Sequence, residues 1–147
     1  MKLFVSRSLP IMLLTTLVFV GCGKNSRPRY TIFMVNRTPR DLKGVEVYFD
    51  GKMAAQKGPL VKGGCASYSY VSLTIPAEAE VRWIDQDVKH APMVKLGGRV
   101  PDNPVKSNIY FIIENDGSVT VATVREDDLD GNVEVTKGVE KLIDKNQ

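Results

Sequence analysis

The chain has 147 residues, of which 43% are hydrophobic and 25% are charged, and this composition excludes a disordered chain and a protein with several membrane spans. The formal net charge is +3, and removing Lys2 and Arg7 of the N-terminal segment from the 20 Lys and Arg residues leaves 18 against 17 Asp and Glu residues. This near balance gives no general attraction to nucleic acid, so no nucleic-acid partner is expected.

Residues 1–21 have the pattern of an export signal. Lys2 and Arg7 are basic, and a largely apolar run follows from Leu9 to Val20. This run of about a dozen residues is shorter than the ~20 residues that a transmembrane helix needs. We therefore predict a cleaved signal peptide rather than a permanent membrane span.

The signal ends in Val20-Gly21 and is followed directly by Cys22. This sequence resembles the bacterial lipobox, in which a small residue precedes an obligatory cysteine. Phe19 departs from that pattern, in which leucine is usual. The resemblance implies a membrane lipoprotein whose Cys22 carries the lipid. Gly23 is not the Asp that retains many such proteins at the inner membrane, which implies the periplasmic face of the outer membrane in a Gram-negative cell. The alternative is an ordinary secretory signal cleaved after Gly23.

Residues 22–29 are polar and are predicted to form the lipidated tether. From Tyr30 to Arg125, short runs rich in Val, Ile, Tyr and Phe alternate with turn signals, which is typical of an all-β domain. We predict strands at 30–36, 45–50, 52–56, 65–73, 80–84, 91–96, 108–114 and 118–125. Seven or eight strands suit a small antiparallel β-sandwich over residues 30–125, with a small closed β-barrel as the alternative.

Three of these runs also predict how their strands are placed or connected. The run 30–36 is apolar on both faces, as a central strand would be. Asp50-Gly51 is a hairpin signal. In the last run, Val119 and Val121 share one face but Val124 lies on the other, which suggests a β-bulge between them.

The C-terminal residues 126–147 differ from the preceding domain. Glu126, Asp128 and Asp130 resemble the start of a calcium-binding EF-hand loop, but the twelfth position is Lys137, where that loop needs Glu. We therefore predict a solvated acidic turn and no metal site. Val139, Leu142 and Ile143 have helical spacing, so a short helix or a flexible tail follows.

Catalytic signatures are missing from the sequence. It contains no nucleophile elbow, phosphate-binding loop or dinucleotide fingerprint, so no enzyme and no cofactor are predicted. Cys65 and His90 could form a dyad only without any local motif, and they are too few for a zinc site. If Cys22 is lipidated, Cys65 is a single thiol, for which a buried small apolar residue is favoured over a reactive or disulfide-forming thiol.

Candidate partner-binding residues are Tyr48, Tyr68 and Tyr70, since tyrosine is favoured in protein interfaces. Core packing is the alternative for them and the favoured interpretation for Trp83.

With the membrane anchor, these features predict a non-catalytic binding or assembly module for an envelope protein, similar in layout to accessory lipoproteins of secretion systems. The alternative is a periplasmic inhibitor or immunity protein against a toxin or a cell-wall hydrolase. In support of it, Gly63–Tyr68 is similar to the glycine-rich loop that leads to a Tyr in lysozyme-inhibitor lipoproteins.

Overall fold

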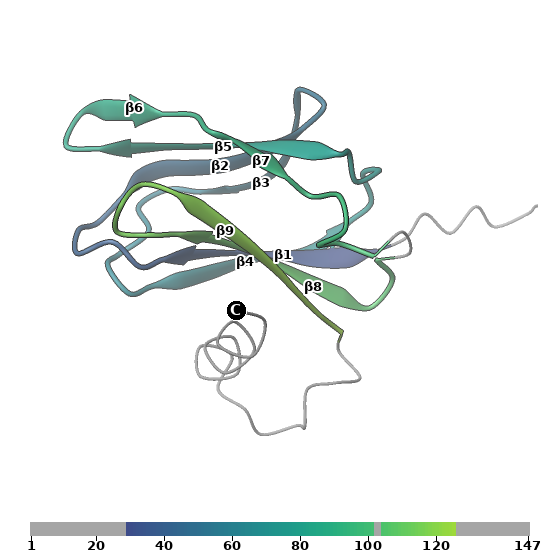
Figure 1. The fold of residues 1–147 in the computed structure, drawn as a ribbon. Helices are drawn as coiled ribbons and strands as arrows, with labels where there is room; N and C mark the ends of the chain where they lie inside the picture. Colours follow the sequence, from purple (N-terminus) through teal and green to yellow (C-terminus); the bar gives the residue numbers. More distant parts are fainter. Residues whose placement is uncertain (1–28, 102–103, 126–147) are drawn as a thin grey trace, which may run out of the picture.

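The alternating apolar residues form strands that assemble into two sheets packed face to face (Figure 1). A computed structural model describes residues 29–101 and 104–125. The first sheet, here the β1 sheet, has the order β4 (Cys65–Val71), β1 (Tyr30–Asn36), β8 (Ser107–Ile113), β9 (Val119–Arg125). The second, the β2 sheet, contains β3 (Lys52–Lys57), β2 (Lys43–Phe49), β5 (Glu78–Asp85), β6 (Val88–His90) and β7 (Met93–Lys95). The predicted all-β sandwich is confirmed over these residues, and the alternative of a closed barrel is wrong. The prediction that all strands pair antiparallel is wrong for one pair, because β1 and β8 are parallel.

The described residues form strands β1 to β9, one more than the eight ranges predicted. The difference arises around the single return strand predicted at 91–96. The structure has β7 within that range and a further short strand, β6, just before it; the two lie on either side of Pro92 and both pair with β5. Proline has no N–H to donate to the ladder, so the pairing is interrupted at that residue.

The bulge predicted near Ala122 or Thr123 is also wrong. β8 and β9 pair without a register shift from Ser107 opposite Arg125 to Ile113 opposite Val119. Val124 departs from the apolar alternation because the outer face of the β1 sheet is apolar as well, and Val124 is buried there. The β1–β4 pair does contain an irregularity, where Tyr30 and Ile32 face Val71 and Tyr68.

The main core lies between the sheets. Strand β2 contributes Val45, Val47 and Phe49, the alternate residues that the sequence pattern singled out. Trp83 of β5 is 3% exposed, so its predicted place in the core is confirmed. A second apolar cluster lies on the outer face of the β1 sheet; its buried members are Val35, Tyr110, Ile112 and Val124, with Phe33 and Ala122 packed against them.

The two ends of the sandwich differ in the segments that they hold. We call the end where β1 begins the Tyr30 end; it also holds the β2–β3 turn and the segments that leave β4 and β7. At the opposite end, the buried side chain of Asn36 hydrogen-bonds the loops that follow β1 and β3. In the described ranges there is no helix of the length and hydropathy required to cross a bilayer.

Candidate partner-binding site

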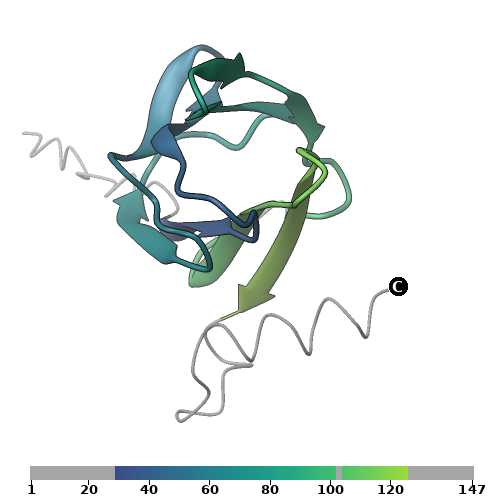
Figure 2. The ribbon, with the colours of Figure 1, turned by 90° about the vertical axis from the view of Figure 1, so that its left-hand side faces the viewer.

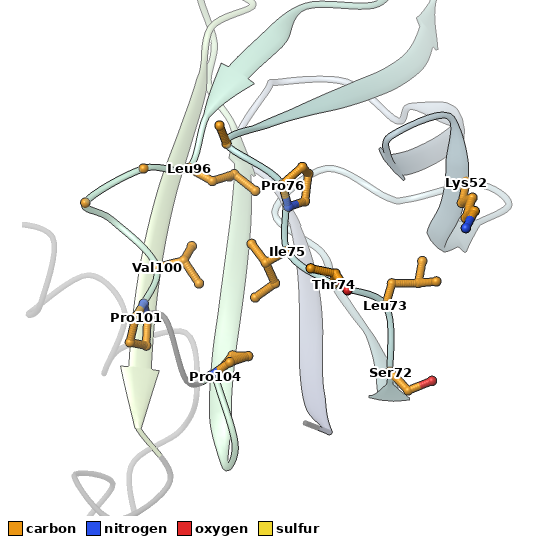
Figure 3. Close-up of a pocket in the computed structure, with 13 residues that line it drawn as sticks. Lys52, Ser72, Leu73, Thr74, Ile75, Pro76, Leu96, Val100, Pro101 and Pro104 are labelled. Carbon is orange, nitrogen blue, oxygen red and sulfur yellow. The ribbon is translucent and has the colours of Figure 1, made fainter. Parts of the chain in front are cut away.

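A pocket of about 650 Å³ opens at the Tyr30 end of the sandwich. Its walls come from the segment 72–77 between β4 and β5 and from the segment that follows β7, with Lys52 at the start of β3 (Figure 3). The side chains of Ile75, Leu96 and Val100 lie close together in the pocket. A volume of this size is within the usual range for a binding site.

Hydrogen bonds to backbone carbonyls hold the two walls in place. The Tyr30 hydroxyl donates to the Leu73 carbonyl at 2.8 Å, and the Leu96 amide donates to the Ala77 carbonyl at 2.8 Å. The amide of Val100 then bonds back to the Leu96 carbonyl at 3.1 Å, which closes the turn after β7. The irregular segments are thereby fixed against β1 and against each other.

The pocket is apolar at its base and polar at its rim. Leu96 is 1% exposed, and Ile75 and Val100 pack against the main core, so the base is the open end of that core. Ser72 and Thr74 are exposed and supply hydroxyls. Such a pocket is suited to an apolar side chain whose flanking backbone hydrogen-bonds the rim.

Tyr68 and Tyr70 are not in this lining; they lie on β4, an edge strand of the β1 sheet that leads directly into the pocket wall. They are 48% and 77% exposed, and the pocket lining begins at Ser72. Tyr70 has a φ of 62°, in the left-handed region, at the irregularity opposite β1. A bulge at an edge disfavours the addition of a further strand, so a partner would contact the rings rather than extend the sheet.

Tyr48, the third predicted residue, is not part of this lining, but it lines a second pocket of about 560 Å³ that shares Pro76, Ala77 and Gly97 with the first. It is on β2, in the other sheet, where its hydroxyl donates to Glu46 at 3.0 Å and Arg82 lies 4.1 Å above its ring. The hydrogen bond to Glu46 is the main reason that the pKa of Tyr48 is raised. Arg82 also makes a two-point hydrogen bond to Glu80, at 2.9 and 2.8 Å. Tyr48 therefore belongs to a separate polar cluster.

Cys65 and His90 are also far apart in the fold. Cys65 begins β4 in the β1 sheet and is exposed, contrary to the expected buried residue, because it lies at a sheet edge. Partial burial still raises the pKa of its thiol, which disfavours the reactive thiolate. His90 is in the β2 sheet, where its ring stacks on Trp83 at 4.9 Å. The two residues do not form a dyad.

Two acidic segments contain carboxylates of the type that bind metal ions. Asp85 is engaged by Arg40 through two hydrogen bonds of 2.9 and 2.7 Å, and this interaction lowers its pKa. Within residues 29–101 and 104–125, no group of three or more His, Cys, Asp or Glu side chains could hold a metal ion. The segment 126–131 and its calcium-loop resemblance lie outside the described residues.

The pocket was not predicted, because its walls are irregular segments that were assigned in part to the ends of predicted strands, at Leu73 and Leu96, and in part to turns. One signal was present: Ile75 and Val100 are apolar residues within turn-rich sequence, where polar residues are expected. Gly63 and Gly64, which carried the similarity to lysozyme-inhibitor lipoproteins, lie in the turn before β4, with Gly63 at a φ of 65°.

No protein-family model and no curated protein matches this chain. Among solved structures, an NMR structure of a protein from Eubacterium rectale is similar, with 18% sequence identity and a TM-score of 0.47. The alignment covers 69% of this chain and 94% of that one. A likeness of this degree carries no information about function.

Proposed function

We propose that this protein is a lipid-anchored component of the cell envelope that acts as a non-catalytic protein-binding or assembly module. The observation that carries the binding role is the exposed pair Tyr68 and Tyr70 on the strand that leads into a pocket with an apolar base. Tyrosine rings at a surface give large contact area at a low entropic cost, and such a pocket accepts an anchoring side chain.

A partner can make several contacts along this surface. An extended segment of the partner passes over the rings of Tyr68 and Tyr70 and inserts an apolar side chain between Ile75 and Leu96. Its backbone hydrogen-bonds the hydroxyls of the rim. Lys52 is the charged residue of the lining, so an acidic residue of the partner fits beside it.

The lipid anchor supports a partner near the membrane surface. The tether 22–29 leads directly into Tyr30, at the end of the sandwich that holds the pocket. At no more than about 3.5 Å per residue, an extended tether keeps this end within roughly 28 Å of the lipidated residue. A tether this short restricts the choice of partners to membrane proteins and proteins that act close to the bilayer.

Replacement of the predicted lipidation site tests the anchor. We expect a Cys22→Ser variant to leave the membrane fraction or to remain unprocessed, because thioether attachment of the lipid requires the sulfur. Cys65→Ser is the matched control and should fractionate like the natural protein. Intact-mass measurement of the natural protein is decisive: an unmodified thiol at position 22 would contradict the anchor.

Loss of the exposed rings tests the binding surface. We expect a Tyr68→Ala/Tyr70→Ala variant to recover a stoichiometric envelope partner at least about tenfold less well in pull-downs from solubilised envelopes, as for interface hot spots. Val88→Ala, which changes an exposed residue of β6 at the opposite end of the other sheet, should recover it normally. Equal recovery by the double variant, or no specific partner with the natural protein, would refute the proposal. A captured toxin or cell-wall hydrolase that the protein blocks would make the module an inhibitor.

A further inference from the structure

The outer face of the β1 sheet carries a second apolar cluster, here the outer cluster, which consists of Phe33, Val35, Tyr110, Ile112, Ala122 and Val124. The pairing explains its composition, since Phe33 is aligned with Tyr110, Val35 with Ile112, and Tyr110 with Ala122. Alternate residues of three neighbouring strands thus form one continuous apolar surface on the side away from the main core.

This surface is buried, although it is an outer face. Tyr110 and Ile112 are 0% exposed, Val124 is 4% exposed and Val35 is 7% exposed. The strands of the β2 sheet all pack on the opposite side, and none of the described strands lies over the outer cluster (Figure 2). Open faces of antiparallel sandwiches normally carry polar residues. Burial here therefore requires a cover from outside the described ranges.

Tyr110 gives a second indication of a cover. Its ring stacks on Phe33, with 4.6 Å between centroids and 14° between planes. Its hydroxyl is buried and has no hydrogen-bond partner among the described residues, and burial raises the pKa of Tyr110 to about 12. Buried hydroxyls are normally hydrogen-bonded, so a polar group from the cover is expected beside this one.

We propose that the C-terminal segment, residues 126–147, is this cover and crosses the outer face of the β1 sheet as a strap. The chain reaches the right place, since residue 126 directly follows β9, whose Val124 belongs to the outer cluster. Val139, Leu142 and Ile143 are spaced as one apolar face of a helix, while Lys141, Asp144 and Lys145 fall on the other side.

The dimensions of the strap fit the surface. Four strands about 4.8 Å apart make a face roughly 15 Å wide, and a helix of about ten residues is also roughly 15 Å long. Residues 126–135 can extend to about 33 Å, which is enough to return from the end of β9 to the middle of the sheet. The strap therefore needs no second molecule to bury the outer cluster.

Accessibility of one outer-cluster position tests the strap in the full-length protein. Val124→Cys, with Cys65→Ser, places a thiol in the cluster whose reaction with a maleimide is read by peptide mass at residue 124. We expect slow labelling, and labelling at least about tenfold faster when Leu142→Asp and Ile143→Asp are added. Lys141→Asp with Lys145→Asp adds the same side chains to the polar side and should leave the labelling slow.

Each outcome decides the proposal. An unchanged fluorescence of Trp83, which lies in the main core, shows that faster labelling reports uncovering rather than unfolding. Continued slow labelling in the Leu142→Asp/Ile143→Asp variant would overturn the strap, and a dependence of labelling on protein concentration would then identify a second copy as the cover. Fast labelling with the natural C-terminal segment would mean that the face is open, and would overturn the strap as well.

Discussion

A Trp83→Ala variant is expected to lose about 3–5 kcal/mol of the free energy of unfolding, the usual cost of removing a large aromatic side chain from a core. Trp83 is 3% exposed and lies in the main core between the two sheets. Its ring also stacks on His90 across β5 and β6, with 6° between the planes. Since domains of this size are stable by about 5–15 kcal/mol, the variant should be near its unfolding threshold at 37 °C.

Urea unfolding followed by far-ultraviolet circular dichroism measures this loss. Trp83 is the single tryptophan, so fluorescence cannot be used for the variant. Val88→Ala is a suitable control on the neighbouring strand, because Val88 is 57% exposed and its truncation should change stability by less than about 0.5 kcal/mol. An unaltered unfolding midpoint for Trp83→Ala would show that the indole is not part of the core.

The second large effect is expected at Asn36, which is 0% exposed. Its amide nitrogen donates to the carbonyls of Arg40, Leu60 and Val61 at 2.7, 2.9 and 3.1 Å. Its oxygen accepts from the amide and the hydroxyl of Thr38 at 2.9 and 2.7 Å. One side chain therefore connects the loop after β1 to the loop after β3, and each buried partner left unpaired costs about 1–3 kcal/mol.

Asn36→Asp keeps the shape of this side chain and replaces the donor with an oxygen that faces three carbonyl oxygens. We expect a loss of about 3–5 kcal/mol at pH 7, similar to that for breaking a buried charged pair. Burial beside carbonyl oxygens raises the pKa of the new carboxyl in the folded state, so the variant is most stable when this group is protonated. Its penalty should therefore grow as the pH rises above about 4, the unfolded-state pKa of Asp.

Unfolding free energies of the variant and the natural protein between pH 4 and pH 8 check both the size and the sign of this effect. Asn115→Asp, in the exposed β8–β9 turn, is the matched control for adding the same charge. If the two variants had the same stability and the same pH dependence, the hydrogen bonds of Asn36 would not hold the two loops together.

Local features of the fold were predictable because local chemistry determines them. Val45, Val47 and Phe49 alternate with polar residues, and Asp50-Gly51 forms the expected turn with φ values of 48° and 75°. Strand pairing was harder, because no local pattern encodes the partner of a strand. All of β8 is buried, and a period of two could identify only the face formed by Ile109, Phe111 and Ile113.

The candidate site was predictable only in part, for a related reason. Tyr68 and Tyr70 were identified from residue type alone, and both are exposed. The pocket depends on contact between segments 72–77 and 96–101, which are adjacent only after β4 has paired with β1 and β7 with β5. Likewise, Tyr48 is held by Arg82 from a neighbouring strand, and the sequence gives no sign of that contact.

The parallel pairing of β1 with β8 has a consequence for folding. It aligns Thr31 with Asn108, residues whose numbers differ by 77, at the centre of the β1 sheet. Closing a loop over such a large sequence separation is slow, and the sheet cannot be completed until residue 113 has been synthesised. A nascent chain should therefore lack the complete β1 sheet through most of its synthesis, and such a chain remains easy to thread, which suits the export that we propose.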